Sequence, residues 1–474
     1  MKTILQAITL MCLLFLGVTS CNNDDESKWI DIPREPQQDE MKIFFNTTPQ
    51  YSEALFYISG NCEINWGDGE ESIIKDNNKN QEIRHHYNEK NKEYIITIRT
   101  SESLESFSNL SINSFVDFKE DNIPEYNDIR IGASVEIKSL YLQTSGVKKL
   151  NIENKLSIGT VNLLLGSDMW DFSMINSKSL SIYMAKKREL EIKDLKVQHL
   201  SITIKEDVDN LSITSCEDLE TVSISAKYPA EPIINNLSVT SLPALNDLRL
   251  NSLTGKNAVL TNLYKLELAL LYKIDYESID FTNNINSTTK KSLKAKGLNV
   301  SKSFKLSKQL ATIEINNREF DPSKGIIEID FSICPELESI DINSMKSLGS
   351  LKFGTNNHLL DKVILRNVAN LNSLDFSECE KIKSIEVAYA SSLSNVKFSS
   401  KNQYVAEVKY QNTNFTESSF IDMVNTLPKS HIPNIPTVNK RQLFLQDNKP
   451  YLKENSAVLN ALNDLSPYWV RFIE

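Results

Sequence analysis

The residues best suited to chemistry are two carboxylates and two histidines in the N-terminal quarter of the chain. Asp68 and Glu70 stand in a glycine-rich segment, and the adjacent pair His85 and His86 follows. Imidazole and carboxylate groups bind transition metals, and a carboxylate pair can carry out acid–base catalysis. Adjacent residues of a strand point to opposite faces, however, and a glycine on each side of Asp68 favours a turn. We therefore expect a structural turn here, with no metal and no catalytic residue.

Cysteine is the next candidate for reactive or metal-binding chemistry. Zinc sites built from cysteine need close pairs such as Cys-x-x-Cys, and the sequence contains none. Three cysteines instead share a frame, each lying three residues after one apolar residue and three residues before another: Cys216, Cys334 and Cys379. A small side chain that turns into the core fits this frame, so we expect structural cysteines.

No short motif of a known catalytic chemistry is present. The sequence lacks GxSxG, HExxH, the P-loop and the dinucleotide fingerprint. With 62 acidic residues in the chain, pairs of carboxylates carry no information. The formal net charge of −10 argues against non-specific nucleic-acid binding. We expect no enzyme activity, no cofactor and no nucleic-acid partner.

A lysine-rich segment is a further candidate for binding. Residues 290–308 contain seven lysines and no acidic residue. Such a basic segment could contact an anionic surface or polymer, and Lys290, Lys291, Lys294 and Lys296 are the candidate anion contacts. The alternative is that these lysines form the solvated flank of two irregular coils.

An apolar pattern with a period near eleven residues indicates how the chain is built. Each unit has the form Leu-x-x-Leu-x-Leu or a related apolar form, and six successive units start 11, 12, 11, 11 and 11 residues apart. Such a period indicates stacked repeats, and the alternation within each unit indicates a short strand with one buried face. Eleven residues are too few for one closed coil, so two units, about 22 residues, should form one turn. The clearest units start at Leu337, Leu348, Leu360, Leu371, Ile382 and Leu393.

The pattern can be traced back to Leu140 and resembles bacterial leucine-rich repeats in which both halves of each coil carry the LxxLxL frame. The resemblance implies a mainly β solenoid over residues 135–414, about twelve coils long. Only 13 glycines are present, so serine, asparagine and aspartate, such as Ser332 and Asn367, should close the turns. A solenoid is a scaffold with an extended surface, which favours binding over catalysis.

Residues 40–100 do not follow this period. Trp66-Gly67-Asp68-Gly69 is a strong turn, and His85, Tyr87 and an alternating strand from Tyr94 follow it. This arrangement resembles the PKD domain, a β-sandwich of extracellular proteins, although the glycine that the family carries between the two tyrosines is missing. The resemblance implies a short β-sandwich that acts as a stalk.

The N-terminus resembles a bacterial lipoprotein signal. After Lys2 comes a nearly continuous apolar run, and Val18-Thr19-Ser20-Cys21 resembles the lipobox, in which the cysteine is acylated and becomes the new N-terminus. We therefore expect residues 1–21 to be a lipoprotein signal peptide with Cys21 as the lipidation site. The lipid would hold the protein on the outer membrane.

The segment after Cys21 should be a linker, residues 22–39. It begins with the acidic run Asn22-Asn23-Asp24-Asp25-Glu26-Ser27 and carries two prolines and few apolar residues. The acidic run resembles the surface-export signal of Bacteroidetes-type surface lipoproteins. The resemblance implies that the protein faces the cell exterior.

The rest of the chain completes the expected organisation. Residues 101–134 should be a transition between sandwich and solenoid, and residues 415–474, where the period fades, should form a small α/β C-terminal cap. We expect a lipid-anchored surface protein whose solenoid binds proteins or host surfaces. The alternatives are a glycan-capturing lipoprotein that serves a polysaccharide uptake system and, third, a solenoid hydrolase with two carboxylates in a groove.

Overall fold

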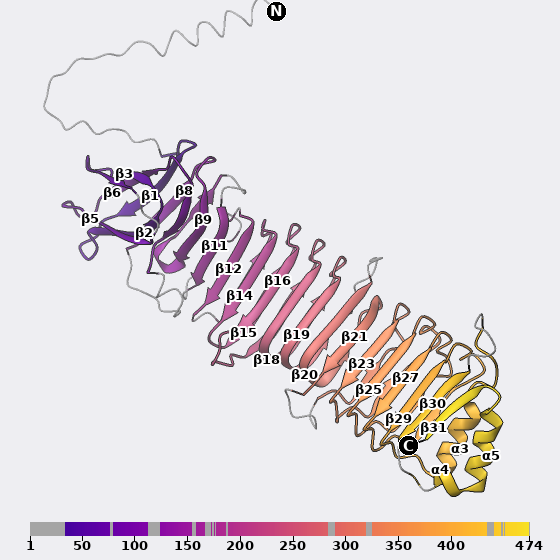
Figure 1. The fold of residues 1–474 in the computed structure, drawn as a ribbon. Coiled ribbons are helices and arrows are strands. Elements are labelled where there is room, and N and C mark those ends of the chain that lie inside the picture. Colours follow the sequence, from indigo (N-terminus) through magenta and orange to yellow (C-terminus); the bar gives the residue numbers. More distant parts are fainter. Residues whose placement is uncertain are drawn as a thin grey trace, which may run out of the picture. The chain divides into compact units, whose positions relative to one another are not determined.

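The structure, a computed structural model, describes residues 34–75, 79–111, 124–153, 158–165, 172, 175, 177–185, 188–282, 290–318, 325–433, 440–446, 449 and 451–473. It is mainly β, with 51% strand and 7% helix, and contains a β-solenoid of about 12 turns (Figure 1). The predicted mainly β class and the predicted solenoid are therefore confirmed. The predicted signal peptide, Cys21 and most of the predicted linker lie outside the described residues.

The N-terminal region contains two small antiparallel sheets. In one sheet β1 pairs with β6 on one side and with β8 on the other. In the other sheet β2 pairs with β5 and β7. The two sheets share a core, in which Phe56 stacks on Trp66 with ring centroids 5.6 Å apart. The strands are β1 (Glu40–Asn46), β2 (Glu53–Ser59), β3 (Cys62–Asn65), β4 (Glu71–Ile74), β5 (Gln81–His86), β6 (Glu93–Arg99), β7 (Leu104–Ser108), β8 (Tyr126–Ile131) and β10 (Leu150–Ile152).

The stretch expected as a transition, 101–134, contains strands of both regions. Strand β8 completes the sheet of β1, whereas β7 pairs in parallel with β9 and so connects the sheet of β2 to the solenoid. The sandwich is thus continuous with the solenoid through hydrogen-bonded strands. The predicted domain boundaries remain predictions.

One side of the solenoid is a single run of parallel strands, here called the first ladder. It continues from β7 to β31 without a change of direction (Figure 1). After β7 its strands are β9 (Ile137–Gln143), β11 (Ile158–Leu165), β12 (Ser179–Met184), β14 (His199–Ile204), β16 (Thr221–Ala226), β18 (Asp247–Thr261), β19 (Leu268–Asp280), β20 (Lys291–Lys305), β21 (Leu310–Asn316), β23 (Ser339–Asn343), β25 (Lys362–Arg366), β27 (Ser384–Ala388), β29 (Glu407–Gln411), β30 (Arg441–Gln446) and β31 (Trp469–Ile473). A short 3-10 helix, η1 (Thr144–Gly146), follows β9.

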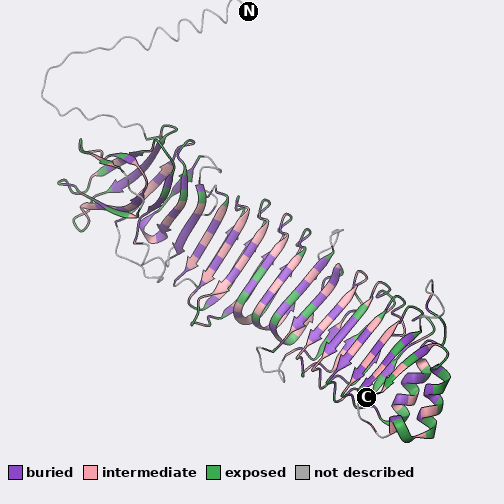
Figure 2. Cartoon of the chain, in the orientation of Figure 1, coloured by how far each residue is buried: buried purple, intermediate pink, exposed green. Residues whose placement is uncertain are grey.

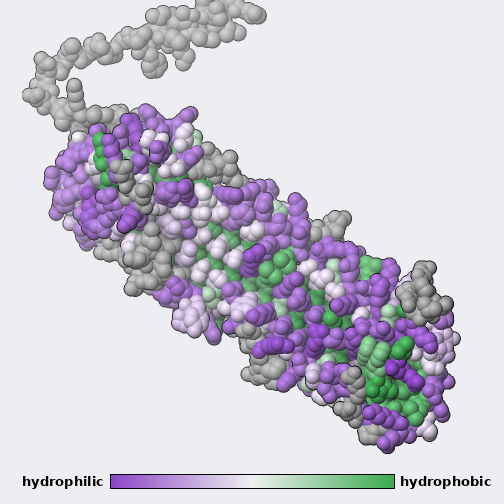
Figure 3. All heavy atoms as spheres, in the orientation of Figure 1, coloured by the Kyte–Doolittle hydropathy of each residue, from purple (hydrophilic) through white to green (hydrophobic). Residues whose placement is uncertain are grey.

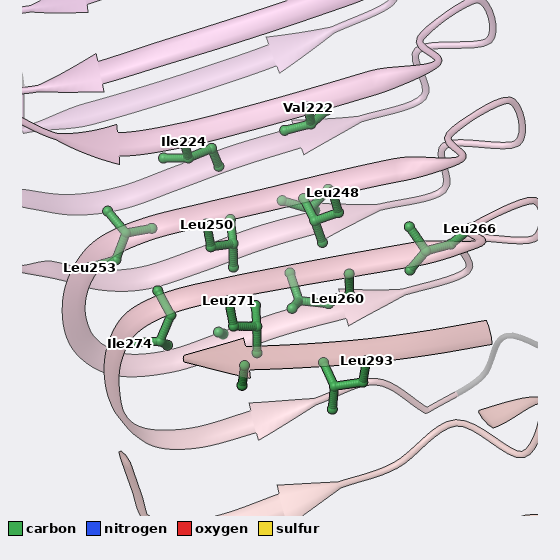
Figure 4. Close-up of a cluster of buried hydrophobic side chains, with 14 of the residues drawn as sticks. Val222, Ile224, Leu248, Leu250, Leu253, Leu260, Leu266, Leu271, Ile274 and Leu293 are labelled. Carbon is green, nitrogen blue, oxygen red and sulfur yellow. The ribbon is translucent and has the colours of Figure 1, made fainter. Parts of the chain in front are cut away.

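The other side of the coils carries the second ladder. It consists of β13 (Glu189–Lys193), β15 (Val208–Thr214) and β17 (Ile234–Thr240), and farther along of β22 (Glu328–Asp330), β24 (Ser350–Lys352), β26 (Ser373–Asp375) and β28 (Asn395–Lys397). Between these two sets, β18, β19 and β20 bend and belong to both ladders (Figure 4). Inward leucines such as Leu248 and Leu260 of β18 fill the space between the two ladders.

The strand register gives the length of one turn. Ser339 pairs with Lys362, 23 residues later, and Lys362 pairs with Ser384, 22 residues later. Two eleven-residue units therefore form one turn, as predicted. Buried and partly exposed residues alternate along the strands, which places the predicted ladder residues Leu374, Phe376 and Ile385 in the core (Figure 2).

Stacked phenylalanines line the core of the C-terminal coils. The ring centroids of successive phenylalanines are 5.9, 5.3 and 5.8 Å apart. Each ring therefore packs on those of the neighbouring coils, so the side chains repeat with the same period as the backbone. The stack consists of Phe331, Phe353, Phe376 and Phe398.

Buried asparagines account for the alternation between 22 and 23 residues. Asn402 is fully buried, and its Nδ2 donates to the carbonyl oxygens of Phe376 and Cys379, both at 2.8 Å. Asn357 makes the corresponding two bonds two coils earlier. In the coils between, a cysteine occupies this position one residue closer to its phenylalanine. The repeating unit of these coils is therefore a pair of turns.

Turn closure follows the expectation from the low glycine content. Asp194, Ser344, Asn367 and Asn412 have φ between 50° and 62°, a region that asparagine and aspartate enter more readily than most residues. At Ser332 the backbone N–H is satisfied by the carboxylate of Asp330. Short polar side chains therefore perform the task that glycine performs in many turns.

The last coils end on a small cap of helices α3 (Glu417–Thr426), α4 (Tyr451–Glu454) and α5 (Ser456–Leu465). Helix α3 begins after Thr416, whose hydroxyl accepts the N–H of Ser419, and packs against β28 and α5. The buried Arg441 donates to the carbonyl oxygens of Gln403, Val405 and Ser430 and lies over the ring of Trp469. None of the helices in the described residues has the length and apolar character needed to cross a membrane.

Candidate binding surface

The carboxylate–histidine segment near residue 68 forms a turn that His85 holds in place. The His85 ring stacks on Trp66 with centroids 4.4 Å apart, and its Nε2 lies 2.7 Å from Oδ2 of Asp68. His86 does not join this group, and its Nδ1 lies 3.5 Å from Oγ of Ser52. Across the residues that the structure describes, no three His, Cys, Asp or Glu side chains are grouped to hold a metal ion. These contacts give His85 a role in the turn.

The cysteines of the sandwich and solenoid are buried thiols. Burial raises the pKa of Cys334 and Cys379 to about 12 and the pKa of Cys216 to about 11. Cys62 is buried as well, and its pKa is raised to about 12 for the same reason. Because the thiolate is the reactive form, these side chains act as small core residues.

The lysine-rich segment is divided between two sides of β20. Lys294 and Lys296 point outward, and Lys290 precedes the strand with its Nζ bonded to Glu338. Lys291, in contrast, is on the inner side and is only 4% exposed, so it is not available as an anion contact at the outer surface. The physical reason is strand alternation, since Lys291 has the same parity as the inward Leu293.

Lys291 lines a small apolar cavity of about 20 Å³ together with residues such as Phe281, Leu293 and Leu310. Its Nζ donates to the carbonyl oxygen of Leu263 at 2.6 Å. Burial lowers the pKa of Lys291 to about 8. The cavity is large enough for about one water molecule and is too small for a substrate.

The outer side of the first ladder changes in character along the chain. On β12, β14 and β16 it is uncharged except for a histidine, and hydroxyl groups predominate. These residues form a pale zone, neither strongly hydrophilic nor hydrophobic, in Figure 3. The outward residues are Ser179, Ser181, Tyr183, His199, Ser201, Thr203, Thr221, Ser223 and Ser225.

Next to this hydroxyl zone lies a group that we call the outer patch, made of outward residues of β18, β19 and β20. Strand β19 presents Leu268, Leu270 and Tyr272, and hydrophobic colour interrupts the middle of this face in Figure 3. The apolar residues are flanked by cations on both neighbouring strands. The outer patch consists of Arg249, Leu268, Leu270, Tyr272, Lys294 and Lys296.

The register of the strands brings these side chains together. Leu270 is paired with Arg249 on one side and with Lys294 on the other. The Nζ of Lys296 lies 5.5 Å from the ring centroid of Tyr272. The sequence indicated the lysines but not the apolar residues beside them, because β19 and β20 are more than twenty residues apart in the chain.

Comparisons with known proteins leave the family open. No protein-family model and no curated protein matches the chain. Among solved structures, the crystal structure of the pneumococcal vaccine antigen PcpA is similar at 10% sequence identity, covering 79% of this chain and 96% of that chain with a TM-score of 0.18. A likeness of this size carries no argument about fold or function.

Proposed function

We propose that the chain is a lipid-anchored cell-surface protein whose solenoid is a non-catalytic scaffold for binding proteins or host surfaces. The observation that carries the proposal is the uninterrupted first ladder from β7 to β31. It offers a long outer face of regularly spaced side chains, a kind of surface that solenoid proteins use for binding. The buried, protonated cysteines and the small apolar cavity fit a structural interior.

The proposal includes the finer fold assignments. The coils of two eleven-residue units support an assignment to the leucine-rich repeats of bacteria. The turn at Gly67 and Gly69, with φ of 79° and 98°, and the stacking of His85 on Trp66 support a PKD-like sandwich. We propose that this sandwich is the stalk between the membrane anchor and the solenoid.

The anchor itself rests on the lipobox-like sequence that ends at Cys21. Acylation of Cys21 would hold the chain on the outer membrane, since more than one acyl chain is needed for stable attachment. The acidic residues Asp24, Asp25 and Glu26 would then direct the protein to the cell exterior.

The second candidate function is glycan capture for a polysaccharide uptake system. The outer patch favours it, because Tyr272 and two leucines form an apolar strip that a sugar ring can cover. Both candidates share the anchor and the scaffold, and they differ in the ligand.

The anchor and the surface display can be tested on cells that produce the full chain. We expect the parent to incorporate a palmitate analogue and to be digested by protease added to intact cells. Cys21→Ala should abolish labelling, whereas replacement of Asp24, Asp25 and Glu26 by alanine should preserve labelling and protect the protein from the protease. Equal labelling of parent and Cys21→Ala would refute the anchor, and unchanged digestion of the triple variant would refute the role of the acidic run.

A further inference from the structure

We propose that the outer patch binds acidic polysaccharides, that is, sugar chains that carry carboxylate or sulfate groups. The inference deepens the proposed function and rests on it, because it names a ligand for the binding scaffold. The first reason is the position of the apolar side chains. Leu268, Leu270 and Tyr272 point away from the core, while the alternate residues Ala269 and Leu271 are buried.

This outward apolar strip differs from the corresponding positions on the neighbouring strands. The strand before it presents Asp247, Arg249 and Asn251, and the strand after it presents Ser292, Lys294 and Lys296. Three apolar residues in a row along one strand, surrounded by polar residues, are typical of a contact surface that a ligand covers. The strip spans about 13 Å, since outward residues are about 6.6 Å apart along a strand.

The second reason is the charge around the strip. Arg249, Lys294 and Lys296 surround it on two sides, and Lys273 Nζ lies 5.5 Å from the centroid of the Tyr272 ring. Two carboxylates neighbour these cations. Asp247 Oδ2 is 2.6 Å from Arg249 Nη2, and Glu314 Oε2 is 3.5 Å from Lys294 Nζ.

The cations of the patch thus outnumber its acids, although the chain as a whole carries a net charge of −10. A local excess of positive charge on an acidic protein favours an anionic ligand at this place and not elsewhere. Carboxylate and sulfate oxygens accept charge-assisted hydrogen bonds from lysine and arginine. The charge therefore indicates an acidic ligand.

The third reason distinguishes a polysaccharide from an acidic peptide. The backbone of β19 is paired on both sides, with β18 and with β20, so a peptide strand has no free edge to extend here. The apolar cavity at β20 opens from the inner side of the strand and offers no socket for an anchoring side chain at the patch. A sugar chain needs neither, because its rings lay their C–H faces on a flat apolar strip while their acidic groups reach the flanking cations.

The proposal is tested by binding measurements on the compact unit Glu35–Glu474. The probes are polygalacturonate, heparin, neutral dextran and poly-glutamate, each measured at low and high salt. We expect binding of polygalacturonate, heparin or both, weaker binding at high salt, and at least tenfold weaker binding of dextran and poly-glutamate. Tyr272→Ala and Lys296→Gln should each reduce binding of the acidic polysaccharide about tenfold or more.

A matched control is Lys352→Gln, which changes an exposed lysine on β24 of the second ladder that is likewise engaged by a neighbour, Glu328. It should leave binding unchanged. Because Tyr272 and Lys296 point outward, the variants should keep the urea midpoint of the parent. The proposal is wrong if neither acidic polysaccharide binds, if poly-glutamate binds as tightly, or if Tyr272→Ala has no effect. These outcomes leave lipidation and surface display untouched, since those are measured on cells.

Discussion

The two halves of the solenoid reach the same inward pattern by different means. In residues 189–240 the second ladder has strands of five to seven residues, whereas in residues 328–397 its strands have three. The C-terminal half replaces the missing backbone pairs with stacked phenylalanines and buried asparagines. The comparison teaches that one coil geometry can be stabilised chiefly by backbone ladders or chiefly by side chains.

The polar side chains of the two halves differ accordingly. In the N-terminal half the asparagines form an exposed row, in which Asn257 donates to Asn236 and Asn236 donates to Asn210, both at 3.0 Å. In the C-terminal half, Asn357 and Asn402 are buried and satisfy backbone groups. The same residue type therefore decorates one half and holds the other together.

The largest effect is expected for an inward residue of the C-terminal half. Leu374→Ala removes a side chain that is 2% exposed and should lower the free energy of unfolding by about 2–5 kcal/mol. Its outward neighbour Ser373 provides the control, and Ser373→Ala should change it by less than about 0.5 kcal/mol. Asp375→Ala should also have a small effect, although its carboxylate accepts the N–H of Ser377. Urea melts would measure all three, and equal losses at inward and outward positions would contradict the strand register.

Asn402→Ala should have the next largest effect. It leaves the N–H of Ser399 without its side-chain acceptor and removes donors from two buried carbonyl oxygens. We expect a loss of about 1–3 kcal/mol. A loss below about 0.5 kcal/mol would mean that side chains do not replace the ladder in this half.

Lys291→Met tests the junction between the halves, where β20 belongs to both ladders. The pKa of Lys291 is about 8 in the fold, below the value near 10.4 of an unfolded lysine. Between these values the unfolded state binds more protons, so the stability of the parent should rise with pH from about 8 to 10.4. The variant should lose this part of the rise and be about 1–3 kcal/mol more stable than the parent at pH 7. Urea melts of both proteins at pH 7 and pH 10 would show it, and parallel pH profiles would contradict the assignment.

The smallest effect is expected for the exposed asparagine row. Asn236→Ala removes hydrogen bonds at the outer surface of the second ladder and should change the free energy of unfolding by less than about 0.5 kcal/mol. The comparison with Asn402→Ala uses one substitution in two environments. Similar losses for both would remove the distinction between the two halves.

Much of this fold could be predicted from the sequence, because it follows from side-chain periodicity. The alternation of Leu374, Phe376 and their polar neighbours predicts which side of each strand is buried, and two units per turn follow from the short period. The bending of β18, β19 and β20 into both ladders could not be predicted, since no turn residue separates their two halves. The use of β8 in the sandwich depends on pairing with the distant β1, which no local pattern reveals.

The candidate site was less accessible to sequence analysis. The lysines were noticed as a group by composition, although alternation alone separates Lys291 from Lys294 and Lys296. Leu270 gave no signal, because a leucine is expected to lie in the core. Its importance comes from its neighbours Arg249 and Lys294, which only the register of three strands brings to it.

The alternation of cysteine and asparagine has a consequence for how this protein can change in length. Asn402 and Asn357 each reach back to a coil that carries cysteine, and the two asparagines are 45 residues apart. Removal of 45 residues would preserve every such contact, whereas removal of 22 or 23 would place two asparagine coils or two cysteine coils next to each other. In this half, insertions and deletions over evolutionary time should therefore come in pairs of coils, so that the reach of the protein from the cell changes in steps of two turns.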